Sequence, residues 1–205
     1  MKGIIFDIGN VIQPVTWEDS ARTLAVPKDK YKTAFMKDRE CYFDFYERGE
    51  LSSTAFARYV LSNLGIEATT ENQDLFQESV RYLWGEPDLR LIHLIRNISP
   101  KVKKAILSNS CPELEERIRS FGGTERGYLH LFEPHVFLSH HIGTKKPEKR
   151  AYEIVVESLG LTPAECCFID DKAENVESAK AIGLQVVLYE NADQIEDLLR
   201  LSKII

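Results

Sequence analysis

The feature that most constrains the fold is the alternation of short apolar runs with amphipathic helical patterns. Five runs are rich in β-forming side chains: Lys2–Phe6, Val102–Leu107, His135–Leu138, Cys166–Ile169 and Gln185–Leu188. The intervening helical patterns include Pro112–Phe121, Glu148–Leu159 and Glu174–Ile182. Strands that alternate with helices favour a parallel sheet with helices on both faces, because each parallel connection crosses over the sheet. We therefore predict an α/β, Rossmann-like fold with its ligand site beyond the carboxyl ends of the strands.

The ends of these helical patterns carry recognisable stop and start signals. Ser110 and Glu113 have the spacing of a capping box for the helix over Pro112–Phe121, and Gly122 follows as a stop. Gly160 and Gly183 stand just beyond the other two patterns. The sequence therefore predicts well-delimited helices in this half of the chain.

The region between Val15 and Trp84 breaks the alternation. It contains helical patterns such as Ser53–Leu64 and Glu71–Leu83 but no convincing strand. We predict a helical-bundle cap over residues 15–84, inserted after the first strand of a core formed by residues 1–14 and 85–205. The aromatic residues gather near the middle of this region: Tyr42, Phe43, Phe45 and Tyr46. We interpret them as the cap's own hydrophobic core rather than as a substrate-stacking surface.

Composition excludes several classes of function. The 205 residues are 43% hydrophobic, and 26 Lys and Arg against 32 Asp and Glu give a net charge of −6. This charge argues against a broad nucleic-acid surface. No apolar stretch reaches the roughly 18 residues of a membrane span, and the first residues lack the order of a signal peptide. We expect a soluble, cytoplasmic protein with neither a nucleic-acid nor a membrane partner.

The cysteines show no metal-binding or redox spacing. Cys41 and Cys111 are isolated, and Cys166 and Cys167 are adjacent in a predicted strand, where they point to opposite faces. We interpret all four as reduced structural thiols.

Polar residues follow the predicted strands where each one ends. Asp7 follows the first strand, Ser108 and Asn109 the second, and Asp170 and Asp171 the fourth. The pair Lys145-Lys146 precedes the helix that comes after the third strand. Each residue alone has an ordinary explanation as a helix cap, a turn residue or a solvated charge. Because parallel strands end at one edge of a sheet, we expect these side chains to meet there.

Such a set suits phosphoryl transfer. A carboxylate with an ordinary pKa of about 3.9 is already ionised at neutral pH, so it can attack phosphorus without a base and form an aspartyl-phosphate. Charge repulsion opposes this attack, and Mg²⁺ held by one or two carboxylates relieves it. Asp7 and Asp171 can supply the carboxylates, with Asp170 bonding through water. Lys146 can offset phosphoryl charge, and Ser108 with nearby backbone N–H groups can donate to phosphoryl oxygens.

The motifs resemble those of the haloacid dehalogenase (HAD) superfamily, most of whose members are Mg²⁺-dependent phosphatases. "FDIGNV" resembles the first motif, "ILSNS" the second, "GTKKPEKRAY" the third and "FIDDKAENVESAKAIG" the fourth. "YERGELSSTAF" resembles part of a helical cap of this family, and the cap lies where residues 15–84 are inserted. The resemblance covers essentially the whole chain. "FDIGNV" is also similar to that of a bacterial subgroup that includes an α-glucose-1-phosphate phosphatase.

The resemblance implies a role for each motif residue. Asp7 would be the nucleophile and a metal ligand, Ser108 a phosphate donor and Lys146 the charge partner. The Mg²⁺ ligands would be Asp7, the Gly9 carbonyl and Asp171, with Asp170 second to Asp171. Ser108, Asn109 and Asn10 would bind the substrate, and Asn10 would alternatively support its loop. Two further residues are less defined: Asn175 would orient Asp171 or be a surface amide, and Lys145 would be solvated.

One position departs from the family pattern. Most of its phosphatases carry a second aspartate two residues after the nucleophile, which protonates the leaving oxygen, whereas this chain has Gly9. Positioned acid–base groups contribute about 10²–10⁴ in rate, so the loss is substantial. A substrate with a good leaving group, such as an anomeric sugar phosphate, needs less protonation. We therefore expect a phosphatase that acts on a small phosphorylated metabolite, with a sugar phosphate favoured.

Two alternatives stay open on the sequence alone. A 2-haloacid dehalogenase also lacks the second acid, but it needs no metal and so leaves Asp170 and Asp171 unexplained. A non-catalytic phosphate-binding or partner-binding homologue would have little use for the retained acids. His140 and His141 could supply a proton, but neighbours on an extended stretch face opposite ways, so at most one could point at the site, and we expect surface or turn histidines. Specificity is expected from the cap. Arg48, Trp17 and the aromatic group could line the substrate site, but we prefer to interpret them as ordinary packing residues of the cap.

Overall fold

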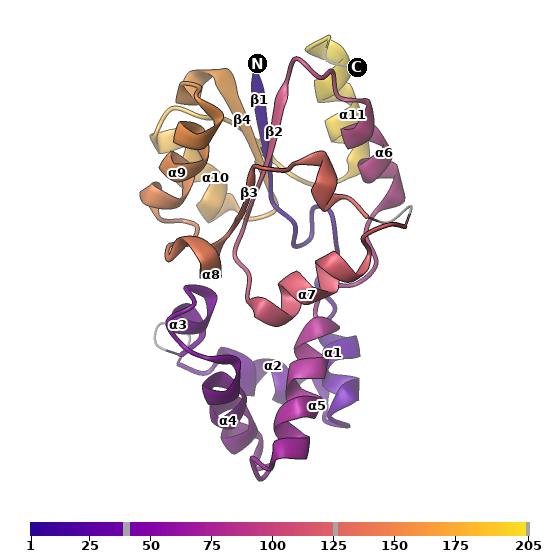
Figure 1. The fold of residues 1–205 in the computed structure, drawn as a ribbon, viewed down its shortest axis with the longest axis vertical. Helices are drawn as coiled ribbons and strands as arrows, with labels where there is room; N and C mark the ends of the chain where they lie inside the picture. Colours follow the sequence, from indigo (N-terminus) through magenta and orange to yellow (C-terminus); the bar gives the residue numbers. More distant parts are fainter. Residues whose placement is uncertain (39–41, 125–126, 204–205) are drawn as a thin grey trace.

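The computed structural model describes residues 1–38, 42–124 and 127–203. Its centre is a parallel sheet of five strands in the order β3-β2-β1-β4-β5. The strands are β1 (Gly3–Phe6), β2 (Lys103–Ser108), β3 (Val136–Leu138), β4 (Cys166–Asp170) and β5 (Gln185–Leu188). Each lies within two residues of its predicted bounds. The predicted α/β, Rossmann-like class is confirmed (Figure 1).

Helices cover both faces of the sheet because the buried side chains of its strands alternate. Ile4 and Phe6 point to one face, where they pack in one cluster with α6 (Leu89–Asn97) and α11 (Ala192–Leu201). Ile5 points to the opposite face, toward α9 (Lys149–Leu159) and α10 (Ala173–Ala181). Strands buried on both faces explain why their sequences are continuously apolar. Figure 1 shows the two pairs of helices on either side of the strands.

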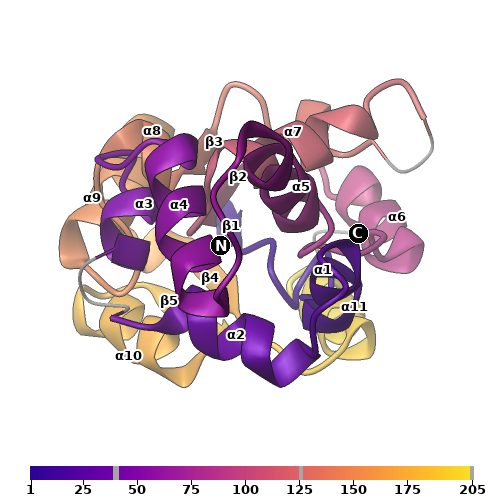
Figure 2. The same cartoon turned by 90° about the horizontal axis from the view of Figure 1, so that it is seen from below.

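Residues 15–84 are called the helical segment below, and the part of it that the structure describes holds five α-helices between β1 and α6. They are α1 (Trp17–Thr23), α2 (Lys28–Met36), α3 (Asp44–Glu47), α4 (Ser53–Leu64) and α5 (Thr70–Arg81). Figure 2, seen from below, places these helices over the carboxyl ends of the strands. The interior of the helical segment is aromatic. The ring centroids of Phe35 and Phe56 are 5.0 Å apart, and those of Phe56 and Phe76 are 5.9 Å apart.

The two connections between the sheet region and the helical segment lie side by side. Val15 and Trp84 form an antiparallel bridge, Thr16 N–H donates to the Leu83 carbonyl at 2.7 Å, and Gly85 N–H donates to the Pro14 carbonyl at 2.9 Å. This pairing coincides with the predicted boundaries at 14/15 and 84/85. The division into a core and a cap domain stays a prediction.

The structure qualifies the prediction for the aromatic residues near position 45. Tyr46 is fully buried, but Tyr42 and Phe45 are among the exposed large side chains. Tyr42 instead stacks on Tyr59, with ring centroids 3.9 Å apart. The interior of the helical segment is therefore built on residues from several helices rather than on this group alone.

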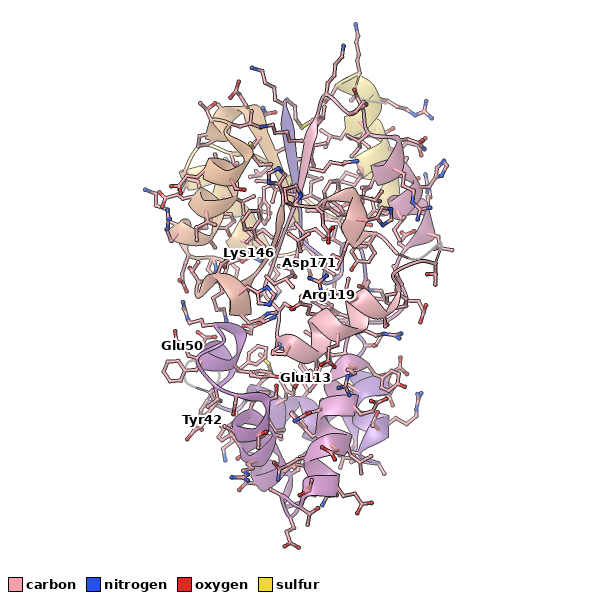
Figure 3. All side chains as sticks on the ribbon, in the orientation of Figure 1. Tyr42, Glu50, Glu113, Arg119, Lys146 and Asp171 are labelled. Atoms are coloured by element: carbon pink, nitrogen blue, oxygen red, sulfur yellow. The ribbon has the colours of Figure 1, made fainter. Side chains whose placement is uncertain are left out.

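The capping-box prediction for α7 (Pro112–Ser120) is wrong. The N-cap is Cys111, which makes no side-chain capping bond, and Pro112 occupies the first turn. Glu113 is buried and accepts a hydrogen bond from the Tyr46 hydroxyl instead. The spacing of Ser110 and Glu113 matched the motif, but the Glu113 carboxylate binds Tyr46 of the helical segment instead of capping α7. Figure 3 shows Glu113 where α7 faces that segment.

Three of the four cysteines lie in the described residues. Cys111, Cys166 and Cys167 are buried free thiols, as expected, and Cys41 lies outside the described residues. Among the described residues no helix has both the length and the apolar character needed to cross a bilayer.

Candidate active site

The polar residues predicted at the strand ends do meet. Asp7 directly follows β1, Asp170 ends the adjacent β4, and Lys146 lies between them. The Lys146 ammonium is 2.7 Å from Asp7 Oδ1 and 2.6 Å from Asp170 Oδ2. All three side chains are at least nine-tenths buried. A buried cation between two carboxylates holds them together, because either acid alone would be an uncompensated buried charge.

The two adjacent aspartates have different surroundings. Asp170 is saturated: Lys146 bonds its Oδ2, the Lys172 N–H bonds its Oδ1, and Asn175 Nδ2 donates to both oxygens at 2.9 and 3.0 Å. Asp171 accepts from Asn10 Nδ2 at 2.9 Å through Oδ2, while its buried Oδ1 has no partner among the described residues. Asp171 therefore has an oxygen open to a ligand, whereas Asp170 acts as a support. Asn175 orients Asp170, not Asp171 as expected.

Two asparagines organise the loops around these acids. Asn10 has a left-handed backbone, with φ of 55°, and its Oδ1 accepts from Val15 N–H at 2.9 Å. Its side chain thus joins the β1 loop to Asp171. Asn109 Nδ2 donates to the Lys146 carbonyl and Asn109 Oδ1 accepts from the Lys146 N–H, both at 2.9 Å. The Asn109 side chain therefore fixes the main chain of Lys146, a role that the sequence did not reveal.

Burial and charge set the protonation of this group. Burial, together with the nearby Asp170 charge, raises the pKa of Asp7 to about 6, although Lys146 acts in the opposite direction. Burial alone would lower the pKa of Lys146, but Asp7 and Asp170 raise it above its ordinary value. Lys146 is therefore charged. The excess of carboxylates over cations favours a further positive charge at this place.

The residues fit a magnesium ion. One oxygen from each of Asp7, Asp170 and Asp171 lies within 4.8 Å of the others. Hard carboxylate oxygens are what Mg²⁺ prefers, and it usually takes only one or two of them and keeps waters. Asp7 and Asp171, with its open buried Oδ1, match that pattern, and Asp170 stays with Lys146. Gly9 lines the same cavity, as its expected role requires.

A cavity of about 150 Å³ lies beside these groups. Its core side is polar and includes Asp7, Ser108, Lys146 and Asp171. Ser108 ends β2 and is buried, and among the described residues its hydroxyl makes only a long contact of 3.5 Å with the Asn109 carbonyl. That hydroxyl is therefore available to a bound group. Figure 3 shows Lys146 and Asp171 at the lower ends of the strands, toward the helical segment.

The opposite side of the cavity is mostly apolar and comes largely from the helical segment. Its apolar lining residues there are Val15, Trp17, Met36, Phe43, Leu83 and Trp84, with Leu114 from α7, and the same segment also contributes the charged Glu47. Trp17 also packs edge-on against Phe35, so it both lines the cavity and packs inside the segment. The predicted role of Trp17 as a packing residue alone is therefore incomplete.

Lys145 is not solvated, which corrects the prediction for it. Its side chain is 5% exposed, and its ammonium pairs with Glu47 and, at 2.6 Å, with Asp44, both from α3. Three residues further along, Glu148 pairs with Arg48, whose Nη1 donates to Glu148 Oε2 at 2.9 Å. The loop that carries Lys146 is thus bound to the helical segment on both sides of that lysine. The ion pairs of Lys145 could not be predicted from the sequence, because two adjacent lysines do not indicate which of them points toward the helical segment.

The two histidines lie on a turn, one of the two settings expected for them, but the backbone there is not extended. They lie on α8 (Ser139–Ile142), a helical turn rather than an extended stretch, and their rings are 4.2 Å apart. The His140 side chain is 5% exposed, and the His141 side chain is about half exposed. Both face Glu115, and neither is among the described residues that line the cavity. Neither histidine takes the place of the missing general acid in this arrangement.

The sequence-family model of the haloacid dehalogenase-like hydrolases matches residues 1–183 of this chain. The chain belongs to that family. Its expected assignment as a HAD-type hydrolase is therefore confirmed. The closer resemblance of "FDIGNV" to one bacterial subgroup stays a prediction.

Two curated relatives and one solved structure illustrate the likeness. D-ribitol-5-phosphate phosphatase from Bacteroides thetaiotaomicron is 25% identical, and the match covers 97% of each chain. Sesquiterpene phosphatase astK from Aspergillus oryzae is 27% identical over 89% of this chain and 87% of its own. A HAD family enzyme from B. thetaiotaomicron, solved with magnesium and inorganic phosphate, has a TM-score of 0.76 at 18% identity and covers 95% of this chain and 98% of its own. The last likeness concerns the fold.

Proposed function

We propose that this protein is a Mg²⁺-dependent phosphatase that hydrolyses a small phosphorylated metabolite through an aspartyl-phosphate on Asp7. The observation that carries the proposal is the Asp7–Lys146–Asp170 group, with the open Oδ1 of Asp171 beside it. The relatives that carry phosphatase names support the reaction class. A dehalogenase would have no need of the Asp170-Asp171 pair.

The residues of this chain can each be given a task. The Asp7 carboxylate attacks phosphorus, the bond from phosphorus to the ester oxygen breaks, and its electron pair leaves with that oxygen. Lys146 offsets charge on the phosphoryl group and keeps Asp7 in place, and the Ser108 hydroxyl donates to a phosphoryl oxygen. Mg²⁺, when bound by Asp7 and Asp171, neutralises phosphoryl charge. Water then attacks phosphorus, which releases phosphate and regenerates the Asp7 carboxylate.

The substrate is proposed to be a small sugar or polyol phosphate. The missing acid at Gly9 favours an ester whose leaving oxygen needs little protonation, such as an anomeric phosphate. The cavity of about 150 Å³ is below the usual range of about 300–1,000 Å³ for ligand sites, which favours a small leaving group. One curated relative is named for a polyol phosphate.

The test is phosphate release from a panel of sugar phosphates, polyol phosphates, nucleotides and acyl phosphates, with Mg²⁺ and with EDTA. We expect turnover that EDTA abolishes and that Asp7→Asn abolishes, because the amide is not a nucleophile. Asp74→Asn, at an exposed position on α5, is the matched control and should keep wild-type activity. Activity that survives EDTA or Asp7→Asn would contradict the proposal, and so would a complete lack of turnover.

A further inference from the structure

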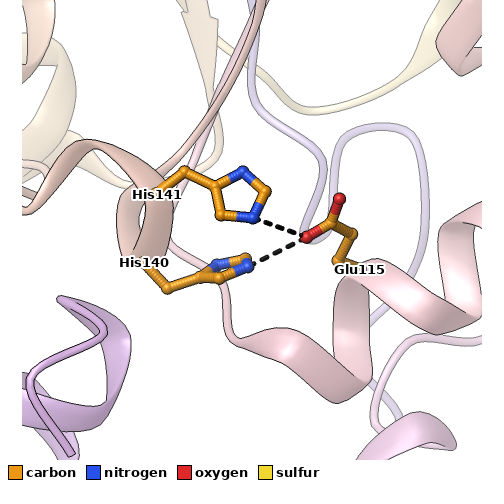
Figure 4. A group of neighbouring side chains, drawn as sticks. All are labelled: Glu115, His140 and His141. Atoms are coloured by element: carbon orange, nitrogen blue, oxygen red, sulfur yellow. Dashed lines mark hydrogen bonds and ion pairs between the residues drawn. The ribbon is translucent and has the colours of Figure 1, made fainter.

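A second group of metal-ligating side chains lies outside the cavity. Glu115 comes from α7, and His140 and His141 come from α8 (Figure 4). Both imidazoles face a single carboxylate oxygen: Glu115 Oε2 is 3.0 Å from His140 Nε2 and 2.9 Å from His141 Nε2. The three atoms lie within 4.8 Å of one another. Two histidines and a carboxylate that converge on one point are a ligand set for Zn²⁺ and similar ions.

The distances are compatible with a metal after a small adjustment. Zn²⁺ binds imidazole nitrogen and carboxylate oxygen at about 2.0–2.2 Å, so ligand atoms of a tetrahedral site are about 3.4 Å apart. The present separations of 2.9 and 3.0 Å are those of hydrogen bonds. The two edges of the coordination triangle that join Glu115 to the imidazoles therefore need to open by about half an ångström. The third edge, between the ligand atoms of the two histidines, is within 4.8 Å. Because His141 is half exposed, solvent can supply the fourth ligand.

The surroundings prepare the three ligands. Arg119 Nε donates to the other oxygen of Glu115 at 2.7 Å, which orients the carboxylate and leaves Oε2 toward the histidines. The His140 side chain is 5% exposed, and its Nε2 is the ring nitrogen that faces Glu115. Its buried Nδ1 has no hydrogen-bond partner among the described residues and is free to carry the ring proton when Nε2 binds a metal.

The backbones that carry the ligands are also fixed to each other. The Ser110 N–H donates to Ser139 Oγ at 2.9 Å, and the Ser139 hydroxyl donates to the Ser110 carbonyl at 3.1 Å. Both serines are buried. These reciprocal bonds join the start of α8 to the residues that precede α7. The ligand atoms therefore sit on two elements whose relative position is already set.

We propose that Glu115, His140 and His141 form a binding site for a divalent transition-metal ion of the Zn²⁺ class, distinct from the carboxylate site. The two sites differ in chemistry. Nitrogen ligands favour Zn²⁺ over Mg²⁺, whereas Asp7 and Asp171 offer only hard oxygens. A metal here joins α7, which follows β2, to α8, which follows β3. It thereby stabilises the folded protein by binding to it in preference to the unfolded chain.

The experiment is equilibrium dialysis of the whole protein against Zn²⁺ in an excess of Mg²⁺, so that Mg²⁺ occupies the carboxylate site. We expect one Zn²⁺ per chain and a rise in the melting temperature with Zn²⁺. His141→Ala should weaken binding by at least about tenfold, because even outer residues of a metal site contribute about 10–100-fold to affinity. Glu115→Gln should act in the same direction. His93→Ala, which removes an exposed histidine on α6, is the matched control.

Each outcome is decisive. Loss of Zn²⁺ binding in His141→Ala and Glu115→Gln, with binding kept in His93→Ala, supports the site. Because His141 is half exposed, its replacement should leave the metal-free melting temperature and the Mg²⁺-dependent activity unchanged, which separates loss of a ligand from loss of the fold. Absence of Zn²⁺ binding in the wild-type protein, or wild-type binding in both variants, would overturn the proposal.

Discussion

The two walls of the cavity are built on different principles. The core wall carries Asp7, Ser108, Lys146 and Asp171 at the ends of strands, where ion pairs and amide hydrogen bonds hold the acids and the lysine in place and leave the Ser108 hydroxyl and Asp171 Oδ1 open. The wall from the helical segment is mostly apolar, with residues such as Trp17, Met36 and Trp84, and Glu47 is its charged member. Directional bonds fix the first wall, and shape complementarity fixes the second. We infer that the core wall sets the rate of the chemical step and the apolar wall selects the substrate.

The largest effect is expected from Lys146→Met. The change leaves Asp7 and Asp170 as buried carboxylates without their cation, which costs about 3–5 kcal/mol in the free energy of unfolding. Activity should fall by at least about 10³-fold, as when one electrostatic stabiliser of a transition state is removed. Chemical denaturation in EDTA measures the stability and steady-state kinetics the activity. Lys172→Met, at an exposed neighbouring lysine, should change the stability little.

A gain of activity is expected from Gly9→Asp. A Cβ at this position would lie 3.5 Å from Trp84 Nε1 and from Val15 Cγ2, which is ordinary contact, so the side chain can be accommodated. A restored acid should raise kcat/KM by up to about 10² for esters of ordinary alcohols, and much less for anomeric phosphates. Gly9→Asn is the matched control, since it adds similar bulk without a proton donor. An equal gain on both substrate classes, or the same gain with Asn, would contradict the role of leaving-group acidity.

The smallest effect is expected on the apolar wall. Met36→Ala enlarges the cavity without touching the acids, and loss of apolar contact with the substrate is worth about 1–3 kcal/mol. KM should rise by about tenfold or more for a substrate that fills the cavity, with kcat nearly unchanged. Thr33→Ala, at an exposed position on the same helix, provides the comparison. A fall in kcat at constant KM would instead show that Met36 affects the chemical step. That result would contradict the proposed division of roles between the two walls.

The core wall could be predicted from the sequence, for a physical reason. In a parallel sheet the position just after a strand fixes where a side chain emerges, so Asp7, Ser108 and Asp170 could be placed without coordinates. The partners of Asn175 and Asn109 could not be predicted, because one helical turn or one loop brings an amide near several acceptors. In both cases the location of the asparagine near the acids could be predicted, whereas its hydrogen-bond partner is known only from the structure.

Residues whose neighbours come from the helical segment were harder to predict. Lys145 and Glu113 are buried only because α3 lies against them, and that contact depends on how two distant parts of the chain pack. The backbone conformation expected at the two histidines was wrong for a local reason. The sequence suggested an extended backbone over His140 and His141, but α8 turns them to the same side, where Glu115 faces both.

The loop from Thr144 to Glu148 has a consequence for substrate access. Within it, Lys145 and Glu148 bind the helical segment through Glu47 and Arg48, while Lys146 binds Asp7 and Asp170. An outward movement of α3 would strip Lys145 of both carboxylate partners and would release the loop on either side of Lys146. Opening the cavity is thus thermodynamically linked to loosening the residue that holds the proposed nucleophile. A substrate that contacts both walls would therefore favour the closed arrangement, in which Lys146 keeps Asp7 ordered. A poorly fitting substrate would leave Asp7 less ordered.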